Sequence, residues 1–385
     1  MKGAWWVGKD DLDDNQKAII TLPEDRSFAI LGPPGSGKTN LLLLRANYLY
    51  LSGYRNLLIV VFTRSLRDFI ALGAGGYDFP MDNVLTSRKW ATRFLVEHGV
   101  KPPRHEDFNQ QRQALLSAIQ TLIEERKIEN LYDAILLDEA QDYTLEEIAV
   151  FRRLTPRLCL AADKKQKLYP GNYAVEEMKS FVDVVKELDL HYRNGMKICR
   201  LADAIGARWP DYNPMLNSCN YDEDSMPSSV DVMSCKNIEQ QAEEIIKRLD
   251  LQLKAYPDEL IGVVAPKNIE LEVLWRQISA SSFAGVATLY GIGQHTGFNA
   301  ETRICVTTAH GAKGLEFRTM HFAGCEFLQN FPNQYELTFT AVTRCKTSIT
   351  IYYSDTLPGY LDAALAKLQP LPELPALSDV FGRKN

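Results

Sequence analysis

The sequence predicts an α/β protein with two domains, each built on a parallel sheet. Apolar runs of strand length alternate with helical patterns along most of the 385 residues, which is typical of parallel sheets joined by helical crossovers. The chain is too long for one typical domain, and its 45% of hydrophobic residues can fill two cores. A glycine-rich loop after the first apolar run adds a phosphate-binding signature.

We expect the first domain to span residues 1–180, with a short helical insertion at about 96–131. The second domain is expected at residues 181–356, because strand and helix patterns alternate again between residues 230 and 278. Residues 357–385 contain four prolines and are expected to form a C-terminal tail.

Composition limits the possible partners and compartments. The net charge of −6 and the isoelectric point near 5.7 argue against a wholly basic surface but leave room for a local basic groove. The seven cysteines stand singly, without a spacing that suggests zinc, as in reduced cytosolic proteins. With no signal pattern and no apolar run of about 20 residues, we expect a cytoplasmic protein and no membrane partner.

The apolar run Phe28–Leu31 is followed by the pattern G-x-x-x-x-G-K-T and then by a helical run. A strand, a glycine loop and a helix N-terminus in this order form a cradle for phosphate. Lys38 would neutralise the β- and γ-phosphates, and the Thr39 hydroxyl would bind Mg²⁺. The alternative is a plain glycine-rich turn. The loop residues are Gly32, Pro33, Pro34, Gly35, Ser36, Gly37, Lys38 and Thr39.

Two further strand ends carry polar groups suited to a nucleotide. Asp138 and Glu139 follow the apolar run 134–137, where Asp138 could hold Mg²⁺ and Glu139 could activate the attacking water. Gln166 follows the apolar run 158–162 and could orient that water. Upstream, the Gln16 amide could pair with adenine, although an exposed helix glutamine remains the alternative.

Hydroxyl, cationic and aromatic side chains gather after two other strands. They are suited to single-stranded nucleic acid, because the polar side chains can bind its phosphates and its bases can stack on the aromatic rings. For Phe62 and Trp90 the alternative is a place in the core. The candidates are Phe62, Thr63, Arg64, Thr86 and Trp90.

The second half of the chain offers two arginines, Arg193 and Arg344. An arginine presented across a domain cleft can stabilise charge on a transferring phosphoryl group. For each arginine taken alone, a surface role is the alternative.

Five motifs occur in one order, and with them the chain resembles the UvrD/Rep-like superfamily 1 helicases. The resemblance implies two RecA-like domains that bind ATP and Mg²⁺ between them and translocate on single-stranded nucleic acid, usually DNA in the 3′ to 5′ direction. The motifs are Gly32–Thr39, Leu137–Asp142, His191–Asn194, Thr308–Phe317 and Ala341–Lys346.

The resemblance also implies roles for single residues. Gln16 would read adenine, and Glu316 would contact the nucleotide from the second domain. Gln166, Arg193 and Arg344 would sense the γ-phosphate. The nucleic-acid groove would be lined by Phe62, Thr63, Thr86, Trp90, Thr308 and His310.

The chain departs from this family in three respects, of which the mildest is that Gln334-Tyr335-Glu336 stands where the family has a basic lead-in to the last motif. Its helical insertions are short, and the residues after Gln166 lack the tryptophan that stacks on a base in relatives. We therefore keep two functional expectations. One is a DNA-stimulated ATPase that translocates, and the other is an ATP-dependent regulatory subunit of a larger nuclease or defence-type complex with a protein partner.

Overall fold

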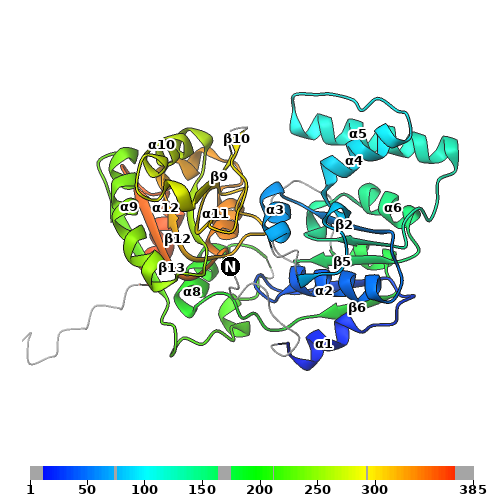
Figure 1. Cartoon of the computed structure of the whole chain (residues 1–385). Coiled ribbons are helices and arrows are strands. Elements are labelled where there is room, and N and C mark those ends of the chain that lie inside the picture. The colour runs from blue at the N-terminus through cyan, green and yellow to red at the C-terminus, as the bar shows by residue number, and fades with distance from the viewer. Residues whose placement is uncertain (1–11, 73–75, 164–174, 211, 292–293, 369–385) are drawn as a thin grey trace, which may run out of the picture.

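The structure is a computed structural model that describes residues 12–72, 76–163, 175–210, 212–291 and 294–368. It confirms the expected α/β class with two sheets of mainly parallel strands, consistent with two Rossmann- or RecA-like domains. The two sheets lie in two lobes, and helices cover each of them (Figure 1). None of the helices in these ranges is both long and apolar enough to cross a membrane.

The first sheet has six parallel strands in the order β3-β2-β4-β5-β1-β6. Strands β1, β2, β4 and β5 are buried along their whole length, as expected for a parallel sheet with both faces covered. The carboxyl ends of parallel strands share one edge, so the loops after β1 and β4 lie near each other. The strands are β1 (Phe28–Leu31), β2 (Leu57–Val61), β3 (Val84–Thr86), β4 (Ala134–Leu137), β5 (Leu158–Ala162) and β6 (Val184–Glu187).

Alternate residues of β1 enter two cores on opposite faces of this sheet. Phe28 and Ile30 pack with α1 and α2, whereas Ala29 and Leu31 join the core that contains α4, α5 and α6. Helix α5 lies within the predicted insertion, and its apolar face belongs to this second core. The helices are α1 (Asp14–Ile20), α2 (Lys38–Leu51), α3 (Arg64–Leu72), α4 (Ser87–Glu97), α5 (Phe108–Arg126), α6 (Leu145–Leu154) and α7 (Val175–Met178).

The second sheet has seven strands in the order β10-β9-β11-β8-β12-β13-β7. All neighbours are parallel except β10, which runs antiparallel to β9 at the edge. The strands are β7 (Ser229–Ser234), β8 (Ile261–Ala265), β9 (Ala287–Gly291), β10 (Gln294–His295), β11 (Ile304–Thr308), β12 (Phe317–Phe322) and β13 (Cys345–Tyr353).

Helices again cover both faces of this sheet. Helices α9 and α10 share one core with β8 and β11, and α8, α11 and α12 pack in the core on the other face. These helices are α8 (Met196–Gly206), α9 (Ile238–Ala255), α10 (Asn268–Ser279), α11 (Gln334–Val342) and α12 (Gly359–Ala366). Short 3₁₀ helices are η3 (Met81–Asn83), η4 (Ala140–Asp142), η5 (Lys179–Phe181), η6 (Met215–Ser218), η7 (Ala284–Val286) and η8 (Cys325–Asn330).

The structure differs from the expected domain limits at two places. Strand β6 pairs with β1, so the first sheet extends to Glu187, beyond the predicted boundary at residue 180. The expected tail at 357–385 begins with helix α12, whose Leu361 and Ala364 are buried. This helix packs against α8 because its apolar residues recur at helical spacing and complete the second-sheet core.

Candidate functional site

The loop between β1 and α2 has the geometry of an anion cradle. Gly35 and Gly37 adopt φ angles of +80° and +84°, which glycine tolerates and other residues rarely adopt. Helix α2 begins at Lys38, directly after Gly37, so its free N–H groups face the loop. A Cβ atom on Gly35 would lie only 2.6 Å from the Cβ of Arg193. The loop therefore touches a segment that leads into the second domain.

Lys38 folds back over this loop. Its ammonium donates hydrogen bonds to the carbonyl oxygens of Gly32 at 2.9 Å and Pro33 at 2.8 Å. Loss of solvation lowers the pKa of Lys38, and the nearby carboxylates of Asp163 and Glu139 counteract part of that shift. A cation is thus held at the mouth of the cradle, where it can exchange carbonyl partners for an anion.

A hydroxyl and a carboxylate meet beside Lys38. The Thr39 Oγ1 atom donates to the carboxylate of Asp138, with distances of 3.2 and 3.0 Å to its two oxygens. Asp138 follows β4 and is buried. Burial and the adjacent charge of Glu139 raise the pKa of Asp138. A divalent cation would relieve both effects, and oxygen donors of these two kinds are the ligands that Mg²⁺ prefers.

Glu139 is held in a left-handed backbone conformation, with φ at +52°. Its carboxylate accepts a hydrogen bond from Gln141 at 2.5 Å and lies 3.6 Å from the ammonium of Lys313. Burial alone would raise the pKa of Glu139, but the positive charges of Lys313, Arg344 and Lys38 hold it below its usual value. Glu139 is therefore ionised at neutral pH, as a general base must be.

The second domain contributes a charged set to the opposite wall. Arg193 is ion-paired with Glu316, whose other carboxylate oxygen lies 3.5 Å from the ammonium of Lys346. Arg344 is 4% exposed, and its Nε lies 3.4 Å from the carbonyl of Thr340. Both predicted arginines are thus built into the interior rather than projecting from the surface.

These residues line one cavity of about 500 Å³ between the two sheets. It brings together most of the predicted nucleotide-site residues, while Gly32 and Pro33 contribute the carbonyls bound by Lys38. Gln166 lies outside the described residues. The predicted residues that line the cavity are Gln16, Pro34, Gly35, Ser36, Gly37, Lys38, Thr39, Asp138, Glu139, Arg193, Glu316 and Arg344.

Gln16 is buried in the lining of this cavity, and its amide is engaged by the protein. Its Oε1 accepts from the backbone N–H of Asp13 at 3.1 Å, completing the N-terminal cap of α1. Its Nε2 donates to the Ser36 carbonyl at 3.3 Å. Asp13 also accepts a hydrogen bond from the Tyr192 hydroxyl at 2.9 Å. Pairing of Gln16 with adenine stays a prediction, and it requires exchange of these partners.

Lys313 links the cavity to the rest of the domain interface. It follows β11, is 1% exposed, and forms an ion pair with Asp142 in addition to its contact with Glu139. Its backbone carbonyl accepts from the Thr63 hydroxyl at 3.0 Å, and the carbonyl of Gly311 accepts from Ser65 at 2.8 Å. The turn after β11 therefore binds the first domain through side chains and backbone.

A second cavity of about 380 Å³ is lined in part by His310 and Gly311, which belong to the same turn as Lys313. Six of the seven residues predicted to bind nucleic acid line it, namely Phe62, Thr63, Arg64, Thr86, Trp90 and His310. Thr308 does not line it, because its hydroxyl accepts the backbone N–H of Gly311 and shapes the turn that carries His310. Burial and the charge of Lys313 lower the pKa of His310, which keeps the ring neutral at pH 7.

The two aromatic candidates differ in accessibility. Trp90 is 5% exposed, packs against Phe94 and Phe151, and donates its indole N–H to Tyr132 at 3.2 Å. This is the core position that the sequence left open as an alternative. Phe62 is only partly buried and meets Tyr143 edge to face. Phe62 thus presents more of its ring to the cavity.

Sequence reasoning missed several side chains at these cavities, of which Tyr192 and Lys313 bear most on the site. Tyr192 lines the first cavity, and the Lys313 ammonium lies near Glu139 of the first cavity and over the Phe62 ring of the second. Both lie inside motifs that were identified, next to Arg193 and three residues after His310. The signal for Lys313 was a lone lysine among small residues in a turn, which ordinarily indicates a solvated surface.

No family model and no curated protein matches the chain. Among solved structures, the chain is similar to the C-terminal domain of a possible DNA helicase from Lactobacillus plantarum WCFS1, with a TM-score of 0.33 and 19% sequence identity. The match covers 46% of this chain and 96% of that domain. Conclusions about function rest on the geometry of the two cavities.

Proposed function

We propose that the chain is an ATPase dependent on nucleic acid, which hydrolyses ATP to translocate on single-stranded DNA in the 3′ to 5′ direction. The observation that carries this proposal is the composition of the first cavity. Lys38, Thr39, Asp138 and Glu139 approach it from the first sheet, and Arg193 and Arg344 line its other wall. A site built from two domains can open and close with each turnover.

The donors fit ATP with Mg²⁺. The loop N–H groups and Lys38 would bind the β- and γ-phosphates, and Thr39 with Asp138 would hold the metal ion. The Nε of Arg193 is buried and finds no hydrogen-bond acceptor among the described residues. A γ-phosphate oxygen would supply that acceptor.

The protein groups then suit phosphoryl transfer to water. Bound Mg²⁺ would neutralise charge on the phosphate oxygens. The ionised Glu139 would accept a proton from the attacking water, and the two arginines would stabilise charge as the phosphoryl group transfers.

The second cavity supports nucleic acid as the activator. Its lining combines hydroxyl, cationic and aromatic groups, the set that binds a single strand. Lys313 contacts Glu139 and belongs to the same turn as His310. A nucleic-acid strand that displaces this turn would therefore change the surroundings of Glu139, the candidate general base. A bound nucleic-acid strand at His310 can therefore influence the candidate general base Glu139 through Lys313.

Steady-state ATP hydrolysis with and without single-stranded DNA or RNA tests the proposal. We expect strong stimulation by DNA, and loss of turnover in Lys38→Ala and Glu139→Gln. Lys247→Ala is the matched control, because Lys247 is an exposed lysine that pairs with Glu244 on a surface helix. ATP hydrolysis that no nucleic acid stimulates would remove translocation from the proposal. ATPase activity retained in Lys38→Ala would contradict the assignment of the first cavity as the ATP site.

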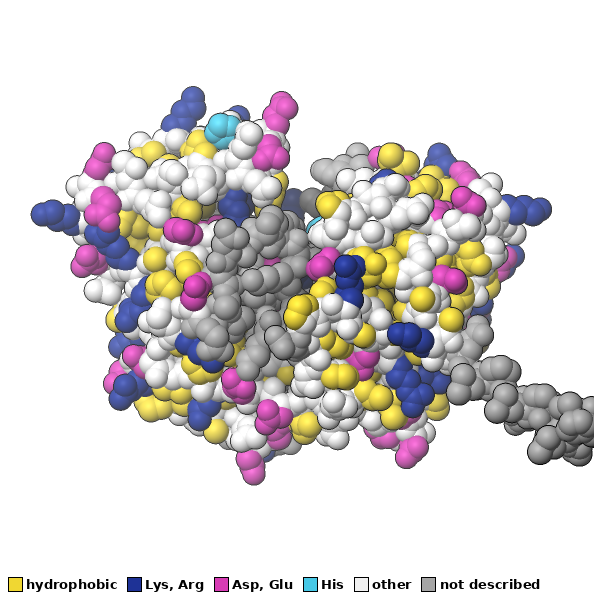
Figure 2. Space-filling model, turned by 180° about the vertical axis from the view of Figure 1, so that it is seen from behind, with side chains coloured by type: hydrophobic (Ala, Val, Ile, Leu, Met, Phe, Trp, Pro, Cys, Tyr) yellow, Lys and Arg dark blue, Asp and Glu magenta, His cyan; other side chains and the backbone are white. Residues whose placement is uncertain are grey.

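A second candidate is an ATP-dependent regulatory subunit that does not unwind DNA alone. Burial of Trp90 in the core favours it, because a large stacking surface is then lost from the groove. Figure 2 also shows acidic and basic side chains interspersed over one face of both lobes. Stable co-purification with another protein, together with negligible strand displacement, would support this candidate. Robust unwinding by the isolated chain would exclude it.

A further inference from the structure

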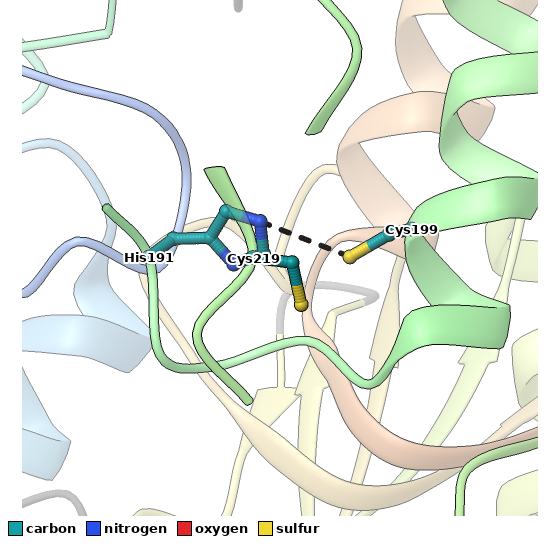
Figure 3. A group of neighbouring side chains, drawn as sticks. All are labelled: His191, Cys199 and Cys219. Carbon is teal, nitrogen blue, oxygen red and sulfur yellow. Dashed lines mark hydrogen bonds between the residues drawn. The ribbon is translucent and has the colours of Figure 1, made fainter. Parts of the chain in front are cut away.

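Three potential metal ligands that are distant in sequence meet beside α8 (Figure 3). His191 and Cys219 are brought together by a backbone bridge between their two segments. Cys199 lies in α8 and faces them. The backbone bridge and the helix thus fix all three positions before any ion binds.

The spacing of the three side chains is close to that of a metal-bound set. The Nε2 of His191 lies 3.8 Å from the Sγ of Cys199, and the three ligand atoms all lie within 4.8 Å of one another. Zinc binds sulfur at about 2.3 Å and imidazole nitrogen at about 2.0–2.1 Å. A tetrahedral site therefore needs a nitrogen–sulfur separation of roughly 3.5 Å, which small side-chain shifts would reach.

The polar atoms of this cluster lack a full set of partners. Both thiols donate to one acceptor, the carbonyl of Asn194, at 3.4 Å for Cys199 and 3.3 Å for Cys219. His191 is fully buried. Its Nε2 lies 2.9 Å from the Met215 carbonyl, whereas its Nδ1 has no hydrogen-bond partner among the described residues. The nitrogen that faces Cys199 is thus Nε2, which donates to a carbonyl oxygen, so zinc binding at Nε2 moves the ring proton to Nδ1.

We propose that His191, Cys199 and Cys219 bind one Zn²⁺ ion. Two thiolates and a neutral imidazole are the ligand types that zinc prefers, and the partial exposure of Cys219 provides an entry route. Binding forms two Zn–S bonds and one Zn–N bond and releases the two thiol protons to solvent. Zinc at Nε2 replaces the hydrogen bond to the Met215 carbonyl, the imidazole stays neutral with its proton moved to Nδ1, and water takes the fourth position.

The cluster lies close to the candidate nucleotide site. His191 is two residues before Arg193, and Asn194, whose carbonyl both thiols contact, follows Arg193 directly. A bound ion would hold this segment rigidly against α8. The inference concerns zinc binding itself, so it stands or fails independently of ATP hydrolysis.

The test is zinc binding by the full chain, reduced and stripped with a chelator. Zn²⁺ is titrated in competition with a chromophoric chelator, and Co²⁺ is used to detect thiolate–metal charge-transfer absorption. We expect one Zn²⁺ per chain, with affinity lowered at least about tenfold in Cys199→Ser and in Cys219→Ser. Cys235→Ser is the matched control, because Cys235 is a buried cysteine in another core.

Each possible result decides the proposal. Loss of binding in the two cluster variants but not in Cys235→Ser supports the site. No binding by the unmodified chain, or equal binding in all variants, overturns it, as does a Cys199–Cys219 disulfide formed in air by a chain that binds no zinc. If the variants do not fold, alkylation of the unmodified chain replaces them. Zinc must then protect Cys199 and Cys219 more than Cys235, and equal labelling would overturn the proposal.

Discussion

Lys313 from the second domain is ion-paired with Asp142 from the first, and both side chains are shielded from solvent. Removing one member of a buried pair leaves the other charge without compensation, which costs much more than loss of a surface pair. The pair therefore joins the domains only while both members are present. Its charge also bears on the candidate base, because Lys313 lies 3.6 Å from Glu139.

We predict that Lys313→Met lowers the free energy of unfolding by about 3–5 kcal/mol. Chemical denaturation followed by circular dichroism measures this change. Lys247→Met is the control, and we expect little change from it because Lys247 pairs with Glu244 at the surface. Equal shifts in the two variants would show that the buried pair does not stabilise the fold.

Gly35→Ala is predicted to weaken nucleotide binding. The new Cβ would meet the Cβ of Arg193 at 2.6 Å in a left-handed backbone conformation, so the loop must move away from Arg193. Gly53→Ala is the matched control, since Gly53 also has a positive φ but nothing lies within 4 Å of an added Cβ. Binding of a fluorescent ATP analogue should fall in Gly35→Ala only. An equal fall in both variants would contradict the role of close approach.

Glu316 is predicted to stabilise the fold in a pH-dependent way. Burial alone would raise its pKa, but Arg193 and Lys346 hold it at about 2, below the usual 4.5. Its stabilisation is therefore complete above about pH 5 and is lost as the pH falls from 4.5 toward 2. Unfolding measured against pH should show Glu316→Gln less stable than the unmodified chain, by roughly 3 kcal/mol at neutral pH. A difference that grows on acidification would contradict this assignment.

The two aromatic residues of the second cavity are predicted to behave differently. Phe62→Ala should weaken binding of single-stranded DNA by about 1–3 kcal/mol, the usual range for one stacked base. Trp90→Phe should leave that affinity unchanged and lower the melting temperature, because Trp90 packs in the core. Fluorescence anisotropy with a labelled oligonucleotide separates the two effects. A large loss of DNA affinity in Trp90→Phe would instead show that Trp90 contacts the bound strand.

Much of the fold could be predicted because parallel strands buried on both faces appear as short, continuous apolar runs. Strands β1, β2, β4 and β5 all have this form. Strand β6 does not, since Val184–Glu187 ends in two charged residues and lies at a sheet edge. That difference explains why the apolar pattern predicts a domain boundary before this strand.

The phosphate loop could also be located, because glycine spacing and strand–helix context are local properties. The ion pair of Lys313 and the cluster around His191 could not, since neither has a characteristic sequence spacing. Cys199 and Cys219 each stand alone in the sequence, and a backbone bridge brings Cys219 to His191. Such groupings depend on tertiary pairing, which a local pattern does not encode.

The chain passes from the first sheet to the second between the end of β6 at Glu187 and the start of α8 at Met196. This connection contains Arg193, which contacts the phosphate loop at Gly35 and the second domain at Glu316. Any rotation of one lobe against the other must turn backbone dihedrals in this stretch. The connection that acts as the hinge therefore also carries Arg193 at the nucleotide site. Movement of one lobe against the other repositions Arg193 directly, with no intervening element.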